Sequence, residues 1–268
     1  MNKTSFLVES SLMKGFTILV GLSALMLALS ACGAGQVFAA QPSATPAPAA
    51  TVTPAFTLTP TEEPTLTPTV TPTPTVTPTA TLPAEAYVED IQGHHQALPL
   101  DCEAAAAVDW AAHFGVTINE FDFQHSLPIS DNPDLGFVGY SNGPWGQIPP
   151  FAYGVHAAPV AAVLNSYGVK ANAAKNFTLD QLYHELAAGR PVIAWIVGDV
   201  NGGTSYEYTD SKGNTTIVAP YEHVITVTGY DPNYIYYLNE QHPYRIETAY
   251  FMRSWKVLGY MVVYRGDQ

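Results

Sequence analysis

A segment rich in proline and threonine, residues 33–86, most strongly limits what this chain can fold into. It contains the irregular run Thr-Pro-Thr-Val-Thr-Pro-Thr-Pro-Thr-Val-Thr-Pro, and its only charges before Glu85 are Glu62 and Glu63. Frequent proline fixes φ and removes backbone donors, so the segment favours an extended, polyproline-like conformation over a packed core. We interpret it as a linker, and we expect the folded domain in residues 87–268.

The first 32 residues have the pattern of an export signal. Two lysines, Lys3 and Lys14, precede an uncharged apolar run at 16–29, which has the length of a secretory signal and is short for a membrane span. The Leu-Ser-Ala-Cys sequence that ends at Cys32 resembles the bacterial lipobox, in which the cysteine becomes the lipidated first residue. This resemblance implies an extracytoplasmic protein anchored by acyl chains at the cell surface. The alternative is cleavage after Ala39, which would leave a secreted protein.

Residues 87–268 are enough for one domain with a substantial core. From Glu85 onward the chain has 8 basic and 20 acidic residues, a formal net charge of −12. Such a surface repels phosphate groups, so binding to nucleic acid is not expected. The eight histidines lack a tight Cys/His ligand spacing, and we expect neither a metal nor another cofactor. We expect a monomer that acts on a peptide or protein partner.

Helical patterns come first in this domain and strand patterns later. Asp101 is a candidate cap for an alanine-rich helix that ends before Gly115, and further helices are expected at 156–167 and 178–189, the last opened by a Thr-x-x-Gln capping box. The expected strands are β-branched and aromatic runs at 191–197, 215–219, 223–228, 234–238 and 258–264. Helices followed by an antiparallel sheet predict an α+β fold.

Cys102 is the only cysteine of this domain, and it lies at the start of the alanine-rich helix. A helix amino terminus stabilises a thiolate, but the neighbouring Asp101 and Glu103 oppose one, so a histidine partner is needed. His223 is the strongest candidate because it opens a β-branched strand that can aim its side chain rigidly. Its neighbour Glu222 is expected on the opposite face of that strand.

These residues, in order, carry a resemblance to a known family. Gln96 precedes Cys102 by six positions, an alanine-rich helix follows, and His223 opens the sequence His-Val-Ile-Thr-Val-Thr-Gly-Tyr-Asp. The arrangement resembles the papain-like cysteine peptidases related to the bacteriocin-leader-processing family, and especially their stand-alone, exported branch. The resemblance implies a papain-like fold in which the nucleophile begins a helix that packs on a C-terminal antiparallel sheet.

The same resemblance assigns roles to four residues. Cys102 is the nucleophile, His223 its proton partner, and the Gln96 amide part of the oxyanion hole. The residue 16 positions after the histidine, here Asn239, orients the imidazole ring. Most relatives have Asp-Pro at that point, so Asn239-Glu240 is a departure, and Asp231 is the rival orienting group.

The implied chemistry is acyl transfer to Cys102 followed by hydrolysis of the thioester. The alternative is a catalytically inactive domain that keeps the fold and displays its cleft as a binding site on a stalk. A tether would serve either function.

Overall fold

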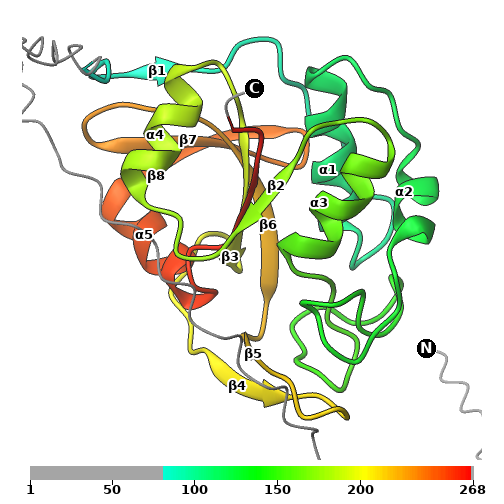
Figure 1. The fold of residues 1–268 in the computed structure, drawn as a ribbon. Helices are drawn as coiled ribbons and strands as arrows, with labels where there is room; N and C mark the ends of the chain where they lie inside the picture. Colours follow the sequence, from blue (N-terminus) through cyan, green and yellow to red (C-terminus); the bar gives the residue numbers. More distant parts are fainter. Residues whose placement is uncertain (1–80, 267–268) are drawn as a thin grey trace, which may run out of the picture. The chain divides into compact units, whose positions relative to one another are not determined.

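An antiparallel sheet with helices on both faces organises residues 81–266, the part of the chain described by the computed structural model (Figure 1). Its strand order is β2-β9-β3-β6-β7-β8, and β1 also pairs with β6. The strands are β1 (Ala86–Tyr87), β2 (Asn172–Ala174), β3 (Val192–Val197), β6 (Glu222–Tyr230), β7 (Tyr234–Asn239), β8 (His242–Glu247) and β9 (Val262–Tyr264). The predicted α+β fold with an antiparallel sheet is confirmed.

One face of the sheet is covered by helices α1 (Cys102–His113) and α3 (Ala157–Ser166), with α2 (Glu120–Ser126) beside α1. The small alanine side chains of α1 let the helix lie close to the sheet, where Trp110 is fully buried. The core on this side also contains Trp195 and Val224 from β3 and β6. The sequence predicted α1 and α3 correctly but not α2.

Asp101 does not cap α1 as expected. Its side chain makes no capping hydrogen bond, and both carboxyl oxygens are buried without a hydrogen-bond partner among the described residues. Burial raises the pKa of this carboxyl to about 6. The aspartate therefore brings a buried acidic group next to the nucleophile in sequence rather than a cap.

The opposite face is covered by α4 (Leu179–Ala187) and α5 (Thr248–Val257). The predicted capping box of α4 is present, because Gln181 N donates to Thr178 Oγ1 at 3.1 Å and Thr178 N donates to Gln181 Oε1 at 2.8 Å. Helix α5 was not predicted, and it packs through Phe251 and Trp255. The strand expected at 258–264 is shorter than predicted, since β9 begins only at Val262.

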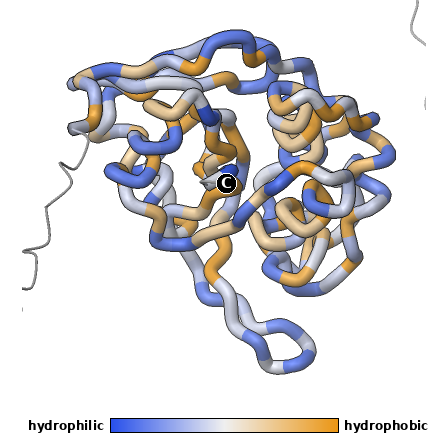
Figure 2. Tube along the Cα trace, turned by 45° about the horizontal axis from the view of Figure 1, so that its top comes forward, coloured by the Kyte–Doolittle hydropathy of each residue, from blue (hydrophilic) through white to orange (hydrophobic). Residues whose placement is uncertain are grey.

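A separate hairpin, β4 (Tyr206–Thr209) and β5 (Thr215–Val218), projects beyond the sheet. Figure 2 shows it mostly in hydrophilic colours, whereas hydrophobic residues gather along the sheet and the helices. The strand predicted at 215–219 corresponds to β5. The expectation that this run belongs to the main sheet is not met, because β5 pairs only with β4.

Contacts with the sheet begin slightly before the predicted boundary at residue 87. Ala86 pairs with Tyr230 in β6, and the Tyr230 hydroxyl donates to Pro83 O at 2.8 Å. The signal, Cys32 and nearly all of the linker lie outside the described residues. Among residues 81–266, no helix has the length and apolar character needed to cross a membrane.

Candidate active site

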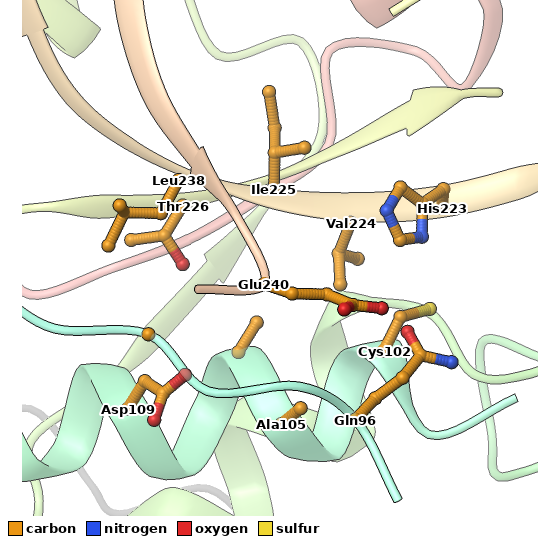
Figure 3. Close-up of a pocket in the computed structure, with 12 residues that line it drawn as sticks. Gln96, Cys102, Ala105, Asp109, His223, Val224, Ile225, Thr226, Leu238 and Glu240 are labelled. Atoms are coloured by element: carbon orange, nitrogen blue, oxygen red, sulfur yellow. The ribbon is translucent and has the colours of Figure 1, made fainter. Parts of the chain in front are cut away.

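The four residues predicted for catalysis converge on the edge of the sheet where α1 begins. Gln96, Cys102 and His223 line one narrow cavity of about 20 Å³, which has room for about one water molecule. Figure 3 shows the Cys102 sulfur below the His223 ring, with the Gln96 amide beside it. Gln96, His223 and Asn239 also line an adjoining open cleft of about 330 Å³. A substrate in that cleft would therefore reach the cavity that contains the thiol.

His223 is oriented by Asn239, which ends the neighbouring strand β7. The ring Nε2 lies 2.8 Å from Asn239 Oδ1, and an amide oxygen accepts hydrogen bonds, so Nε2 carries the proton and Nδ1 keeps a lone pair. Burial lowers the pKa of His223, and this effect outweighs the opposing hydrogen bond to Asn239. The ring is therefore a neutral base with Nδ1 available.

Asp231, the rival orienting group, is engaged elsewhere. It lies in the turn between β6 and β7, where it accepts hydrogen bonds from the backbone of Asn233 and Tyr234, each at 2.8 Å, and from the Tyr236 hydroxyl at 2.7 Å. These contacts stabilise the turn. The structure thus brings Asn239, and not Asp231, to the imidazole ring.

Gln96 belongs to an extended segment that crosses the end of the cavity. Its Nε2 donates to Leu98 O at 2.7 Å, which fixes the amide and leaves its second N–H available. The segment is held by His94, whose ring contacts Asp109 Oδ1 at 2.7 Å and Glu120 Oε2 at 3.1 Å. Helices α1 and α2 together therefore position the candidate oxyanion donor.

The Cys102 thiol is directed at a carboxyl rather than at a histidine. Its Sγ donates to Glu103 Oε2 at 3.2 Å, while Glu103 Oε1 accepts from Val155 N at 2.6 Å. Cys102 is 7% exposed and Glu103 only 1%. Burial, then the charges of Glu103 and Glu222, raise the pKa of Cys102 well above its usual value. This structure therefore describes the neutral thiol.

Glu222 is a further acidic neighbour, and its position was not foreseen. The sequence predicted that the Glu222 and His223 side chains leave the strand on opposite faces. It did not predict that the Glu222 side chain lies next to α1, near Cys102 and Glu103. One side-chain atom each of Cys102, Glu103 and Glu222 lies within 4.8 Å of the other two. We assign no metal to this cluster, because a thiol and two carboxyls can be neutral through their own protons. The alternation rule gave the direction of Glu222 but not its partners.

Aromatic side chains form part of the open cleft. Trp145 donates from Nε1 to Glu222 O at 2.8 Å, and its ring lies edge-on to His223 with the centroids 6.2 Å apart. Tyr244 lines the same cleft and stacks on Tyr237. The backbone oxygen of Glu222 thus anchors a cleft wall, while its side chain lies next to Cys102.

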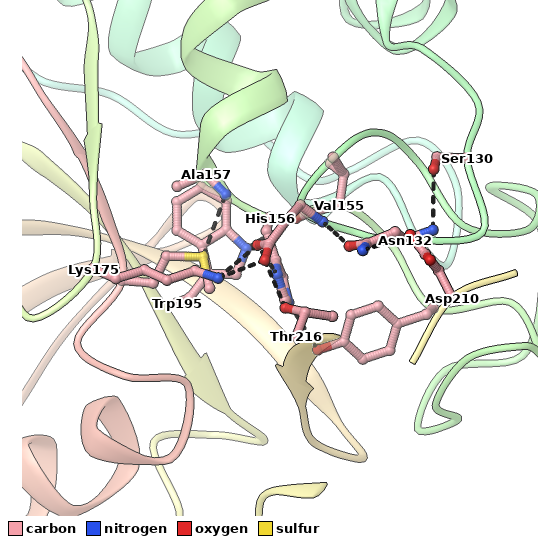
Figure 4. A network of polar contacts seen from close by, with 12 residues as sticks. Ser130, Asn132, Val155, His156, Ala157, Lys175, Trp195, Asp210 and Thr216 are labelled. Atoms are coloured by element: carbon pink, nitrogen blue, oxygen red, sulfur yellow. Dashed lines mark hydrogen bonds and ion pairs between the residues drawn. The ribbon is translucent and has the colours of Figure 1, made fainter. Parts of the chain in front are cut away.

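A buried polar network supports the loop that contacts Glu103 (Figure 4). His156, fully buried, has Nδ1 2.7 Å from Asp134 Oδ1, and Asp134 also accepts from Lys175 and Thr216, in each case at 2.7 Å. Although burial opposes its ionisation, these hydrogen bonds hold the pKa of Asp134 well below its usual range. Trp195 Nε1 donates to Val155 O at 3.0 Å. The peptide groups around Val155 are therefore rigidly placed.

Comparison with known proteins agrees with this architecture. Residues 88–263, about two thirds of the chain, match the model of the Peptidase_C39 like family. The uncharacterized protein YvpB of Bacillus subtilis (strain 168) is 30% identical over 146 residues, which are 52% of this chain and 54% of YvpB. The match therefore spans about half the length of that relative.

A solved structure supports the same fold. A crystal structure from Bacillus anthracis, described as a "putative C39-like peptidase", has a TM-score of 0.60 at 18% identity and covers 69% of this chain and 98% of that one. Xylellain, a cysteine protease from Xylella fastidiosa, has 14% identity and a TM-score of 0.39 over 70% of this chain and 88% of that one, a value too low to carry a structural argument. The match over residues 88–263 shows that this chain belongs to the Peptidase_C39 like family.

Proposed function

We propose that the protein is an exported, membrane-tethered thiol peptidase that cleaves peptide bonds with Cys102, His223, Asn239 and Gln96. The observation that carries the proposal is the 2.8 Å contact between His223 Nε2 and Asn239 Oδ1, because it leaves Nδ1 as a base in the cavity that contains the thiol. Family membership supports a peptidase-type activity. The tether rests on Cys32 and the proline-rich linker in the sequence.

The reaction begins when His223 Nδ1 takes the proton of Cys102. The thiolate attacks the carbonyl carbon of the scissile peptide, and the carbonyl oxygen becomes an oxyanion. The free N–H of Gln96 and the backbone N–H of Cys102 are the donors for that oxyanion, and loss of one such donor typically raises a barrier by about 2.7–4 kcal/mol. The imidazolium then protonates the leaving amine, and water hydrolyses the thioester.

A second candidate function is a catalytically inactive binding domain. The observation that favours it is the hydrogen bond from Cys102 to Glu103, together with the raised pKa of the buried thiol. A thiol held in this way is a poor nucleophile until it turns toward His223. The same cleft would then bind peptides without cleaving them.

Labelling by a thiol-directed, active-site inhibitor of papain-type enzymes distinguishes the two functions. We expect wild-type protein to be modified at Cys102, Cys102→Ala to resist modification, and His223→Ala to react about 10²- to 10⁴-fold more slowly because it lacks the base. The matched control is His184→Ala, since His184 is exposed on α4, does not line the cavity or the open cleft, and forms an ion pair with Asp180. Equal labelling rates for wild type and His223→Ala would favour the inactive binding domain.

The tether is tested independently of the chemistry. When the protein is produced in a bacterial host that acylates lipoproteins, the wild type is expected to partition into the detergent phase and to carry acyl chains at Cys32, whereas Cys32→Ala is expected in the aqueous phase. Aqueous partitioning of the wild type, with an amino terminus after Ala39, would instead establish secretion.

A further inference from the structure

Two buried carboxyl groups lie beside the Cys102 sulfur without a positively charged partner. Glu103 is 1% exposed and Glu222 3%, and neither forms an ion pair with a described Lys, Arg or His residue. Glu222 Oε1 is buried and has no hydrogen-bond partner among the described residues. The other titratable groups that affect this pair are Asp101 and Tyr153, and neither supplies a positive charge.

Two carboxylates so close together in a buried site are not stable as a pair of anions. The cost of removing each charge from water and their mutual repulsion both favour retention of a proton. Burial raises the pKa of Glu103 to about 7, and burial together with Glu103 raises the pKa of Glu222 well above its usual value. The pair therefore retains at least one proton in neutral solution.

Glu103 is held in place by specific contacts. It connects the nucleophile to the loop before α3, because one oxygen accepts from the thiol and the other from Val155 N. A Cβ atom at Gly154 would collide with Glu103 Oε1 and lie 3.1 Å from Glu222 Oε2. Gly154 also has a φ of +126°, which side chains rarely tolerate. The loop is thus shaped to admit both carboxyls.

We propose that Glu103 is a positioning residue for the nucleophile: it holds the Cys102 thiol in the resting protein and, when protonated, donates a hydrogen bond to the attacking thiolate. The inference rests on the proposed function, since it concerns the same thiol. Glu222 supports this role by disfavouring ionisation of Glu103.

In the active state one proton leaves the Cys102 thiol and the proton of Glu103 stays in place. The S–H bond breaks, its electron pair stays on sulfur, and the proton moves to His223 Nδ1, which gives a thiolate and an imidazolium. The proton of Glu103 stays on its carboxyl and forms the O–H···S⁻ hydrogen bond. An ionised Glu103 would instead repel the thiolate and oppose the transfer.

The test is the pH dependence of Cys102 alkylation by iodoacetamide in the full-length protein, followed by mass spectrometry of the peptide that contains Cys102. In wild type the rate should rise less steeply with pH above about 7, because Glu103 then ionises and disfavours the thiolate. Glu103→Gln keeps a hydrogen-bond donor without the charge. We expect it to restore the steeper rise and to increase the rate at about pH 8 by about tenfold, the equivalent of one pKa unit. Glu222→Gln should move the Glu103-dependent change to lower pH, because Glu103 then lacks the neighbouring carboxyl that disfavours its ionisation.

The matched control is Glu207→Gln, because Glu207 is an exposed glutamate on β4. It should leave the profile unchanged. If Glu103→Gln folds with an unchanged melting temperature and its profile is that of wild type, Glu103 has no positioning role and the inference is overturned.

If Glu103→Gln does not fold, infrared difference spectroscopy of wild type and Glu222→Gln decides the matter. The inference requires a protonated-carboxyl band in wild type that disappears as pH rises through about 7 and that is altered in Glu222→Gln. Absence of such a band overturns it. Alkylation needs no peptide substrate, so a protein that shows the Glu103 effect but cleaves nothing would contradict the proposed function alone.

Discussion

Burial works against the chemistry proposed for Cys102, and individual contacts determine how much of that cost remains. Burial disfavours both members of the ion pair, since it raises the pKa of Cys102 and lowers that of His223. The hydrogen bond from His223 Nε2 to Asn239 favours the imidazolium. Asn239 is therefore the side chain that most directly offsets the cost of forming a charged histidine.

Asn239→Ala should slow both inhibitor labelling and peptide hydrolysis. Hydrogen bonds to charged groups contribute about 1.5–3 kcal/mol, so we expect a decrease of about 10- to 100-fold. Asn239→Asp keeps an acceptor, adds a negative charge and should raise the pKa of His223, which proton NMR of the ring can measure. A rate in Asn239→Ala equal to that of wild type would mean that the ring is oriented by something else.

Glu103 also links stability to pH. Glutamate has a pKa of 4.5 as a free side chain and about 7 in this fold, so between these values the folded protein binds more protons than the unfolded chain. The free energy of unfolding should therefore fall as pH rises from about 4.5 through about 7. Urea denaturation at about pH 5 and about pH 8 measures the fall.

Glu103→Gln should make that fall smaller. His94 acts in the same direction in both proteins, because its raised pKa gives stability that is present below 6.5 and lost as pH rises through the folded value. The difference between the variant and wild type therefore removes the contribution of His94 and reports Glu103 together with its effect on Glu222. Identical pH dependence in the two proteins would show that Glu103 ionises normally.

The segment before α1 depends on two helices for its position. Burial opposes a charge on His94, but hydrogen bonds to Asp109 in α1 and Glu120 in α2 outweigh it and raise its pKa. Glu120 also accepts from Ala97 N at 2.9 Å. These contacts hold Gln96 at the cavity, so α2 contributes to the candidate oxyanion hole without touching the thiol.

His94→Ala should reduce peptide hydrolysis by about tenfold, which corresponds to about 1.4 kcal/mol in the barrier, because Gln96 becomes mobile. Alkylation of Cys102 by iodoacetamide forms no oxyanion, so its rate should change little. Gln96→Ala is the reference for complete loss of the donor and should show the same selectivity. Equal losses in hydrolysis and alkylation would instead indicate a disrupted α1.

Elements with local signals were predicted well from the sequence, and those fixed by long-range packing were not. The Thr178 capping box and the glycines that end α1 and α3 identify three helices. Helix α5 has no side-chain cap, and its β-branched and aromatic residues are also typical of a strand. Its packing against the sheet through Phe251 and Trp255 is a long-range feature that the sequence does not show. Helix α2 does carry a signal, since Asn119 accepts from Asp122 N at 3.2 Å, and it could have been found.

The same distinction applies to the site. The spacing of Gln96, Cys102, His223 and Asn239 could be compared with a known family, and the structure brings these residues together. The proximity of Glu103 to Glu222, within 4.8 Å, joins residues far apart in sequence, and it depends on how α1 packs on β6. Strand alternation predicts the face of the sheet on which the Glu222 side chain lies. It does not predict which residue packs against that face.

The whole domain is acidic, and the charged side chains of the cleft follow the same trend. None of the residues that line the cavity or the open cleft is Lys or Arg, and Asp199 in the cleft is exposed and has no hydrogen bond or ion pair with a described residue. Trp145 and Tyr244 line the same cleft. Carboxylate and aromatic groups together attract cations, which predicts a preference for substrates with Lys or Arg near the scissile bond.

Cleavage of a peptide library, analysed by mass spectrometry, should show this preference in wild type and a weaker one in Asp199→Asn. Asp199→Lys should favour acidic peptides, because reversal of one charge reverses the local field. Asp180→Asn is the control, since Asp180 is an exposed aspartate on α4. The preference should weaken as salt increases, because an exposed carboxylate is screened within about 10 Å at 0.1 M ionic strength. A cationic preference that survives Asp199→Asn unchanged would place its origin in another part of the cleft.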